Sequence, residues 1–273
     1  MLGTDLVAAL SGRDVTALTR RDLDVSDRDA VAAAVAGYDT VINASAFTRV
    51  DDAETEEDAA YLVNASGVEN LALASAAAGA TLVSYSTDYV FDGTASSPYP
   101  EGAPTSPVTA YGRTKAEGER LALAANPGRT LILRTAYLYG QHGANFAATM
   151  LRLASAHPTV SVVTDQVGQP TWTADLAMQT LATLDAGVRS GILHATNSGQ
   201  ASWFDFARAI FEANGLDPER VLPTDSTSFV RPAPRPAYSV LGHDRWADVG
   251  IAPMRPWREA LAAAVSSGAI GAP

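Results

Sequence analysis

The chain has 273 residues, enough for one large domain or two modest ones with a buried core. Its 47% hydrophobic and 18% charged residues exclude a disordered chain, and no apolar run approaches the roughly 20 residues of a membrane span. The net charge of −11 argues against a nucleic-acid backbone as the main partner. The absence of cysteine excludes disulfide scaffolds and thiolate sites, and together with the lack of a signal peptide it favours a cytoplasmic protein.

The chain begins where the first turn of a nucleotide-binding fold would end. Gly3 reads as the last glycine of a phosphate-binding loop, followed by an alanine- and leucine-rich helix. The first strand and the rest of the glycine-rich loop are missing from this sequence. We expect Met1 to be an internal methionine preceded by roughly 8–15 residues, one strand plus a loop. The alternative is that Gly3 belongs to an unstructured tail.

Short β-branched runs then alternate with alanine-rich helical patterns. Strands are predicted at 15–18, 40–43, 81–85 and 130–134, and helices at 27–35, 56–77 and 110–125. This alternation is typical of βαβ units, in which a parallel sheet is covered by helices on both faces. The sequence therefore predicts an α/β, doubly wound Rossmann-type sheet that lacks its first strand.

After about residue 136 the pattern becomes less regular. Helices are predicted at 145–155, 174–186, 204–212 and 257–265, and strands at 160–163 and 192–195. We predict that residues 1–140 form a dinucleotide-binding domain to which 171–196 returns, and that 141–273 form mainly a smaller substrate-binding lobe. Four tryptophans are expected to anchor the core of that lobe: Trp172, Trp203, Trp246 and Trp257. The four histidines lack ligand spacing, so no metal site is expected.

Lys115 is the only lysine among 19 basic residues, and it follows Tyr111 by four positions in a helical pattern. The two side chains therefore share one helix face. A tyrosine hydroxyl with a pKa of about 10 is a poor acid near neutrality, but an adjacent ammonium and a positively charged cofactor ring stabilise the phenolate. The pair predicts acid–base chemistry, although this spacing also arises by chance.

Two strand ends support the catalytic interpretation. Ser86 and Thr87 follow a predicted core strand, at the carboxyl edge where active sites of such sheets lie. The small residues 43–46 end the preceding strand and leave room for a flat ligand to approach the backbone. Simple turn capping is the alternative for the two hydroxyls, but it does not explain all three motifs together.

This combination resembles the dTDP-4-dehydrorhamnose reductases, within the extended short-chain dehydrogenase/reductase superfamily of NAD(P)-binding Rossmann proteins. The resemblance runs from residue 2 to about residue 265. Its matching stretches are 43–54, 64–68, 86–93, 111–115, 134–140, 145–146, 165–171 and 235–239. The stretches 48–54 and 86–91 are specific to this family, whereas the Tyr/Lys pair marks only the superfamily.

The resemblance implies that NADPH or NADH reduces the C4 keto group of dTDP-4-dehydro-6-deoxy-L-mannose to give dTDP-L-rhamnose. By similarity, Tyr111 donates the proton, Lys115 holds the nicotinamide ribose and lowers the pKa of Tyr111, and Thr87 orients Tyr111. The implied substrate contacts are Thr87, Asp88, Val50, Tyr137 and Arg235. The implied cofactor contacts are Gly3, Asp24, Val25, Ala46, Phe47, Thr48, Tyr85, Tyr111 and Lys115.

Two positions leave questions of specificity open. Tyr137 stands where some family members carry a tryptophan against the sugar, which leaves the choice of sugar open. Arg235 either reaches a diphosphate or is a surface arginine in a proline-rich loop. The sequence also does not decide between NADPH and NADH.

Two other functions remain as alternatives. A nucleotide-sugar epimerase or dehydratase shares the Tyr/Lys pair but recycles its cofactor. A non-catalytic regulatory or binding subunit of the same fold, like that of methionine adenosyltransferase, has no evident need for Thr87, Tyr111 and Lys115 together. The expected partner is a dTDP-linked 4-keto-6-deoxy sugar, with no nucleic acid or membrane, and a homodimer is one candidate assembly.

Overall fold

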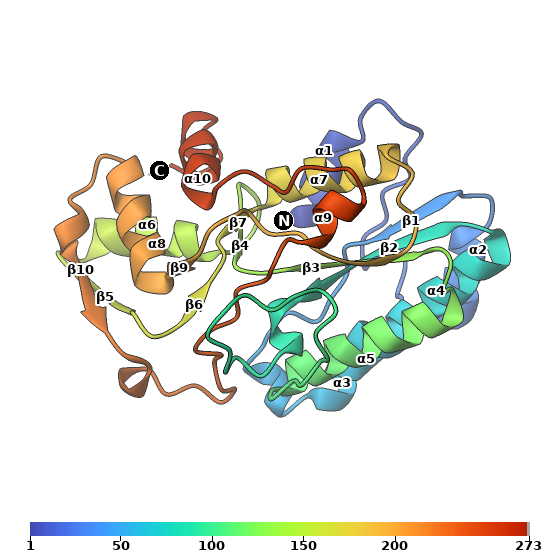
Figure 1. The fold of residues 1–273 in the computed structure, drawn as a ribbon, viewed down its shortest axis with the longest axis horizontal. Helices are drawn as coiled ribbons and strands as arrows, with labels where there is room; N and C mark the ends of the chain where they lie inside the picture. The colour runs from blue at the N-terminus through green and yellow to red at the C-terminus, as the bar shows by residue number, and fades with distance from the viewer. Residues whose placement is uncertain (272–273) are drawn as a thin grey trace.

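A parallel sheet lies at the centre of the larger part of the molecule (Figure 1). The computed structural model describes residues 1–271. The strand order is β1 (Thr40–Asn43), β2 (Thr81–Thr87), β3 (Thr130–Thr135) and β8 (Gly191–His194), with every adjacent pair parallel. The predicted α/β fold with a parallel central sheet is confirmed.

Helices cover both faces of this sheet. Figure 1 shows α1 (Leu2–Ala9) and α7 (Thr173–Asp185) on one face, and α2 (Arg28–Val35), α4 (Gly67–Ala78) and α5 (Ala110–Ala125) on the other. The predicted helix at 56–77 is divided into α3 (Glu57–Tyr61), a π-helical turn η2 (Leu62–Ser66), and α4. All residues of β2 and β3 are buried because both strands have a neighbour on each side and helices on each face.

The predicted strand at 15–18 is wrong. These residues form no β-ladder, and Val15 and Leu18 are 41% and 48% exposed. Within residues 1–271, β1 is the first strand of the chain and the end strand of the sheet. A β-branched run becomes a strand only where another strand accepts and donates its main-chain hydrogen bonds, and residues 15–18 have no such neighbour.

A second core lies beyond the carboxyl ends of the strands, at the left of Figure 1. It packs α6 (Phe146–Ala156), α8 (Trp203–Ala213) and α10 (Trp257–Ser266) with the parallel pair β5 (Val160–Val163) and β10 (Val221–Thr224). A reciprocal capping box between Ser202 and Asp205 starts α8. The last residues of the predicted lobe, 272–273, lie outside the described part of the chain.

Two short strand pairs join the cores. β4 (Leu138–Tyr139) runs parallel to β7 (Thr171–Trp172), and β6 (Val167–Gly168) runs antiparallel to β9 (Ala201–Ser202). The remaining short helices are η1 (Asp52–Glu54), η3 (Asp88–Val90), η4 (Pro218–Arg220), η5 (Ser226–Ser228) and α9 (Arg245–Asp248).

The expectation that Trp246 anchors the second core is wrong. Trp246 packs with Leu2, Leu133 and Leu193 in the core between the sheet and helices α1 and α7. Its indole nitrogen donates a 2.8 Å hydrogen bond to the carbonyl of His194 at the end of β8. The C-terminal segment therefore returns to the sheet before α10 crosses back, an arrangement that local sequence patterns do not reveal.

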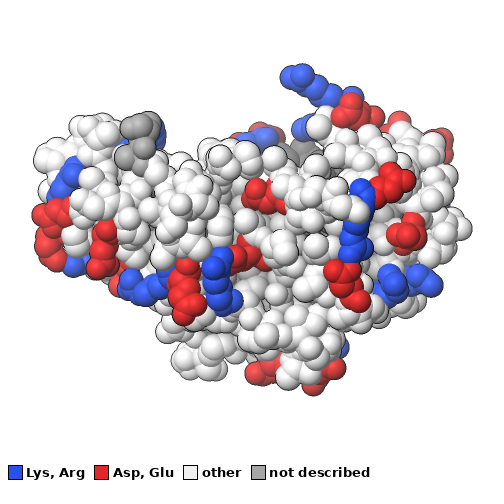
Figure 2. Space-filling model, turned by 90° about the horizontal axis from the view of Figure 1, so that it is seen from above, with Lys and Arg blue, Asp and Glu red and all other residues white. Residues whose placement is uncertain are grey.

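The charged side chains on the face in Figure 2 are mixed in sign, with acidic and basic groups interspersed. None of the helices in residues 1–271 has both the length and the apolar character needed to cross a membrane.

Candidate active site

The carboxyl end of β2 and the first turns of α5 bring the predicted catalytic residues together. β2 ends at Thr87, which also accepts the Tyr89 N–H at the start of η3. Helix α5 lies beside β2 and is capped at its N-terminus by Thr109, whose hydroxyl accepts the Gly112 N–H at 3.0 Å. This cap fixes the first turn of α5, and with it Tyr111.

Tyr111 is a half-buried phenol within hydrogen-bonding reach of the Thr87 hydroxyl. Its ring contacts Tyr89 edge-on, with centroids 5.7 Å apart. Burial raises the pKa of Tyr111 to about 12, the Thr87 hydrogen bond lowers it, and the nearby Asp88 carboxyl raises it. Tyr111 therefore keeps its proton at neutral pH, but it is a weaker acid than a free phenol, and the lowering of its pKa that was expected from Lys115 is not seen in this structure.

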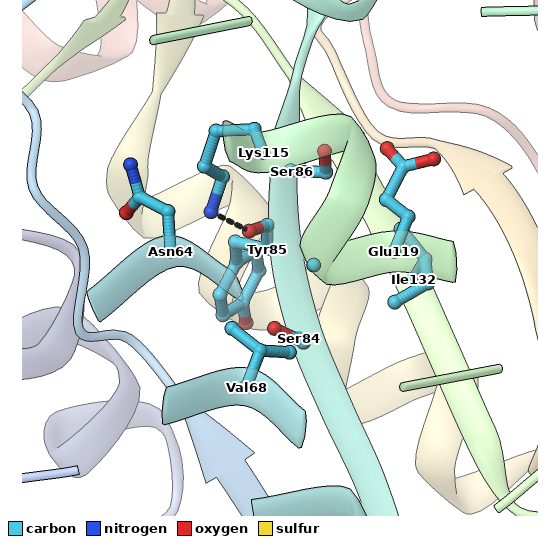
Figure 3. Close-up of a pocket in the computed structure, with 9 residues that line it drawn as sticks. Asn64, Val68, Ser84, Tyr85, Ser86, Lys115, Glu119 and Ile132 are labelled. Carbon is cyan, nitrogen blue, oxygen red and sulfur yellow. Dashed lines mark hydrogen bonds between the residues drawn. The ribbon is translucent and has the colours of Figure 1, made fainter. Parts of the chain in front are cut away.

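Lys115 lies one helical turn further along and is 5% exposed. Its ammonium donates a 2.6 Å hydrogen bond to the main-chain carbonyl of Tyr85 (Figure 3). It lines a small pocket whose wall includes Asn64, Ser86 and Glu119. Burial lowers the pKa of Lys115 to about 8, and the charge of Glu119 opposes that fall.

Asp88 is the acidic group of the site and is 2% exposed. Its carboxylate accepts hydrogen bonds from the Thr87 hydroxyl at 3.0 Å and from the Ser239 hydroxyl at 2.5 Å. Burial raises the pKa of Asp88 to about 6, although both hydrogen bonds act to lower it. Sequence reasoning assigned no role to Ser239, which lies 151 positions away from Asp88.

The loop after β1 forms a wall of small or exposed residues. Ala46 is half-buried and Thr48 is exposed, whereas the ring of Phe47 is buried. Asn64 holds this loop, because its side-chain oxygen accepts the Phe47 N–H at 2.9 Å and its amide donates to the Phe47 carbonyl at 3.1 Å. Sequence analysis gave Asn64 no role, although it lies in a matching stretch.

Gly3 lies near the start of α1 and faces this wall. A Cβ atom built on Gly3 would lie 3.7 Å from the Cβ of Ala44. The exposed loop after β1 and the start of α1 offer a dinucleotide both backbone access and helix N–H groups. With the buried ammonium of Lys115 beyond them, these residues fit NADPH or NADH.

Other predicted cofactor residues are less directly placed. Asp24 is exposed and accepts hydrogen bonds from the main chain and hydroxyl of Ser26. Val25 packs against Gly67, where a Cβ atom would lie only 2.6 Å from the Val25 methyl group. The ring of Tyr85 points to α7, where its hydroxyl bonds Thr180 at 2.7 Å, so only its carbonyl meets Lys115.

Three predicted substrate residues surround the junction of the two cores. Tyr137 follows β3, has a left-handed φ of 47°, and stacks on Trp203 with centroids 3.7 Å apart. The guanidinium of Arg235 bonds Asp51 at 2.9 Å, so it is held against the loop leading into η1. Val50 is half-buried in that same loop.

In residues 1–271 no group of three or more histidine, cysteine, aspartate or glutamate side chains is arranged to hold a metal ion. His194, one of the four histidines, is fully buried in the core of the sheet.

Comparison with known proteins gives matches over nearly the whole chain. Residues 1–269 match the family described as the RmlD substrate binding domain. The dTDP-4-dehydrorhamnose reductase of Mycolicibacterium smegmatis is 51% identical over 262 residues, covering 95% of this chain and 80% of the relative. The dTDP-4-keto-6-deoxy-D-glucose reductase of Streptomyces niveus is 49% identical over 265 residues, covering 96% and 92%.

A solved structure agrees closely with the fold. The dTDP-4-dehydrorhamnose reductase of Bacillus anthracis, in complex with NADP, is similar with a TM-score of 0.94 and 36% identity. The match covers 97% of this chain and 95% of that chain. The similarity therefore includes both cores and the junction between them.

Proposed function

The chain belongs to the dTDP-4-dehydrorhamnose reductase family, and from that premise we propose that it reduces the C4 keto group of a dTDP-linked 4-keto-6-deoxy sugar. The substrate proposed is dTDP-4-dehydro-6-deoxy-L-mannose, the reductant NADPH or NADH, and the product dTDP-L-rhamnose. The observation that carries this proposal is the placement of the Tyr111 phenol beside Thr87, with the buried Lys115 ammonium one helical turn away.

The cofactor, when bound, supplies the hydride that reaches C4. Tyr111 donates its proton to the developing alkoxide oxygen, so the carbonyl gains one hydride and one proton. Its pKa of about 12 ensures that the proton is present at neutral pH. Thr87 and the Lys115 ammonium then stabilise the phenolate that remains.

The two cores divide the remaining work. We assign residues 1–140 and 171–196 to the cofactor and 141–273 mainly to the sugar nucleotide. The cofactor contacts we propose are Gly3, Asp24, Val25, Ala46, Phe47, Thr48 and Tyr85, beside Tyr111 and Lys115. Around the sugar nucleotide we place Val50, Thr87, Asp88, Tyr137 and Arg235. The ring of Tyr137, already stacked on Trp203, offers a flat and rigid surface to a sugar.

The test is the variant Tyr111→Phe in the full-length protein, assayed by oxidation of NADPH with the dTDP-linked keto sugar. We expect a loss of activity of at least about 100-fold, as befits removal of a general acid. Tyr89→Phe is the matched control, because this phenol touches the Tyr111 ring but has no role in the proposed proton transfer. Undiminished turnover in Tyr111→Phe would refute the assignment.

The same assay separates the alternatives. A reductase consumes one NADPH per sugar reduced, whereas an epimerase or dehydratase recycles its cofactor. A binding subunit gives no turnover in the wild-type protein. Parallel assays with the L-mannose and D-glucose forms of the keto sugar test the choice of sugar, since relatives named for different sugars match this chain at 51% and 49% identity.

A further inference from the structure

A buried ion pair that the proposed chemistry does not use connects α5 to β3. Glu119 and Arg134 make two parallel contacts, Nε to Oε1 at 2.9 Å and Nη2 to Oε2 at 2.6 Å. Their side chains are only 6% and 2% exposed. Burying two charges costs desolvation free energy, which makes such a pair poor evidence for stability by itself. Glu119 lies on α5, the helix that carries Tyr111 and Lys115, so the pair can act on those two residues.

The contacts of Arg134 with its neighbours show which side chains around it are charged. Its Nη1 atom lies 3.4 Å from Nε2 of His194, whose Nδ1 atom lies 2.9 Å from the Gly242 carbonyl. A carbonyl only accepts, so Nδ1 carries the proton and Nε2 presents a lone pair to Arg134. Burial lowers the pKa of His194 to about 3, and the Arg134 charge acts in the same direction. His194 is therefore neutral, and Glu119 alone balances Arg134.

Glu119 also lies one helical turn from Lys115 on the same face of α5. Both side chains are 5% exposed and line the same pocket. In the view of Figure 3 the Lys115 ammonium and the Glu119 carboxylate lie on either side of Ser86. The Ser86 hydroxyl is buried without a hydrogen-bond partner. Lys115 and Glu119 thus share a poorly solvated space in which charges interact over longer distances than in water.

The other titratable groups near Lys115 come from several elements. Tyr111 is on α5 itself, Tyr85 on β2, Asp88 on η3, Arg134 on β3 and His194 on β8. Burial raises the pKa of Tyr85, so its hydroxyl stays protonated; this hydroxyl faces α7 and adds no charge near Lys115. Apart from burial, the charge of Glu119 is the cause that acts on the pKa of Lys115.

We propose that Glu119, held by Arg134, is a positioning residue that keeps the buried Lys115 ammonium charged beside Tyr111. Arg134 prevents the Glu119 carboxylate from turning away, and the negative charge of Glu119 in turn favours the protonated form of Lys115. Where it concerns catalysis, the inference rests on the proposed reductase function. It predicts that the alkaline limit of activity is set by loss of the Lys115 proton.

The single lysine makes the charge state directly measurable without any assay of activity. In protein labelled with ¹³C at the lysine ε-carbon, the one side-chain resonance reports Lys115, provided that no tag adds another lysine. We expect the midpoint of its titration to fall by about one pH unit in Glu119→Gln. The surface variant Glu117→Gln, which removes the exposed Glu117–Arg120 pair on the same helix, is expected to leave the midpoint unchanged.

Two further variants separate charge from packing. Glu119→Asp keeps the negative charge and is expected to restore most of the wild-type midpoint. If Glu119→Gln does not fold, the double variant Glu119→Gln/Arg134→Gln leaves neither partner as an uncompensated buried charge, and we expect a downward displacement there as well. An unchanged midpoint in the folded variant, or an equal displacement in Glu119→Asp, would overturn the proposal.

The pH profile of kcat/KM gives the catalytic readout. In Glu119→Gln the alkaline limb of the profile is expected to move to lower pH by the same amount as the midpoint of the lysine titration. At a fixed pH on that limb, kcat/KM is then expected to fall about tenfold. If Tyr111→Phe retains full activity, the proposed function fails whatever Lys115 does. If Tyr111→Phe is inactive but the limb stays in place, the reductase assignment stands and only this inference fails.

Discussion

The buried carboxyl of Asp88 makes the stability of the protein depend on pH in an unusual direction. Most carboxylates are stabilised in their charged form by folding, but Asp88 is 2% exposed and its pKa rises from 3.8 to about 6. The folded state therefore binds a proton that the unfolded chain has already released. Replacing Asp88 with asparagine removes this burden, and the effect is expected to appear only above the ordinary pKa.

The size follows from the two pKa values. One pH unit corresponds to 1.36 kcal/mol, so the change from 3.8 to about 6 lowers the free energy of unfolding by about 3 kcal/mol. Below about pH 3 both states are largely protonated and the cost is absent. Between these values stability falls with rising pH, and above the folded pKa the full cost persists.

Urea unfolding of wild type and Asp88→Asn from about pH 3 to about pH 8 tests this. The variant is expected to gain about 3 kcal/mol relative to wild type across that range. A constant offset is also expected, because the Thr87 or Ser239 hydroxyl must turn to accept from the new amide. Only the pH-dependent part is diagnostic. The gain should be accompanied by reduced turnover, since Asp88 is a proposed substrate contact.

Asp92 is the matched control, four positions away. The Tyr99 hydroxyl donates to its carboxylate at 2.7 Å, and this hydrogen bond lowers the pKa of Asp92. Asp92→Asn should therefore lose stability relative to wild type as the pH rises, the opposite slope to Asp88→Asn. Parallel curves for Asp88→Asn and wild type would refute the reasoning, because Asp88 would then ionise equally in both states.

Two further substitutions test the packing around the site. Gly118→Ala should destabilise the protein by about 1–3 kcal/mol in urea unfolding, since its new Cβ would lie 2.0 Å from the Asn64 carbonyl; a neutral result would mean that α5 and η2 separate freely. Arg134→Met should cost about 3–5 kcal/mol by leaving Glu119 buried without its partner, and adding Glu119→Gln should recover much of the loss. If Glu119→Gln does not recover stability, the loss in Arg134→Met comes from altered packing and not from the unpaired charge of Glu119.

The strands and helices that were predicted correctly are those whose own residues, through β-branched runs or helical spacing, specify the secondary structure. The strand at 40–43 and the helix at 110–125 agree with β1 and α5, and the predicted run at 130–134 is one residue shorter than β3. β-branched residues and a threonine cap specify these elements locally. The strand predicted at 15–18 fails because a strand also requires a neighbour.

The same distinction applies to the site. Tyr111 and Lys115 are four residues apart on one helix, so the sequence alone places them on one face. The hydrogen bond from Ser239 to Asp88 and the pairing of Glu119 with Arg134 depend on how distant segments meet. Each of these residues carries an ordinary side chain, and no local pattern distinguishes it from a surface residue.

The return of the chain from one core to the other has a consequence for any attempt to dissect the protein. The core between the sheet and helices α1 and α7 contains residues from Leu2 to Met254, and the second core contains residues from Tyr139 to Ile270. Every single cut within these limits therefore divides at least one core between two fragments. A protease nick beside Val230, which is 89% exposed, would leave two pieces that hold each other folded, and expression of residues 1–140 alone would yield a fragment without α7, β8 and Trp246.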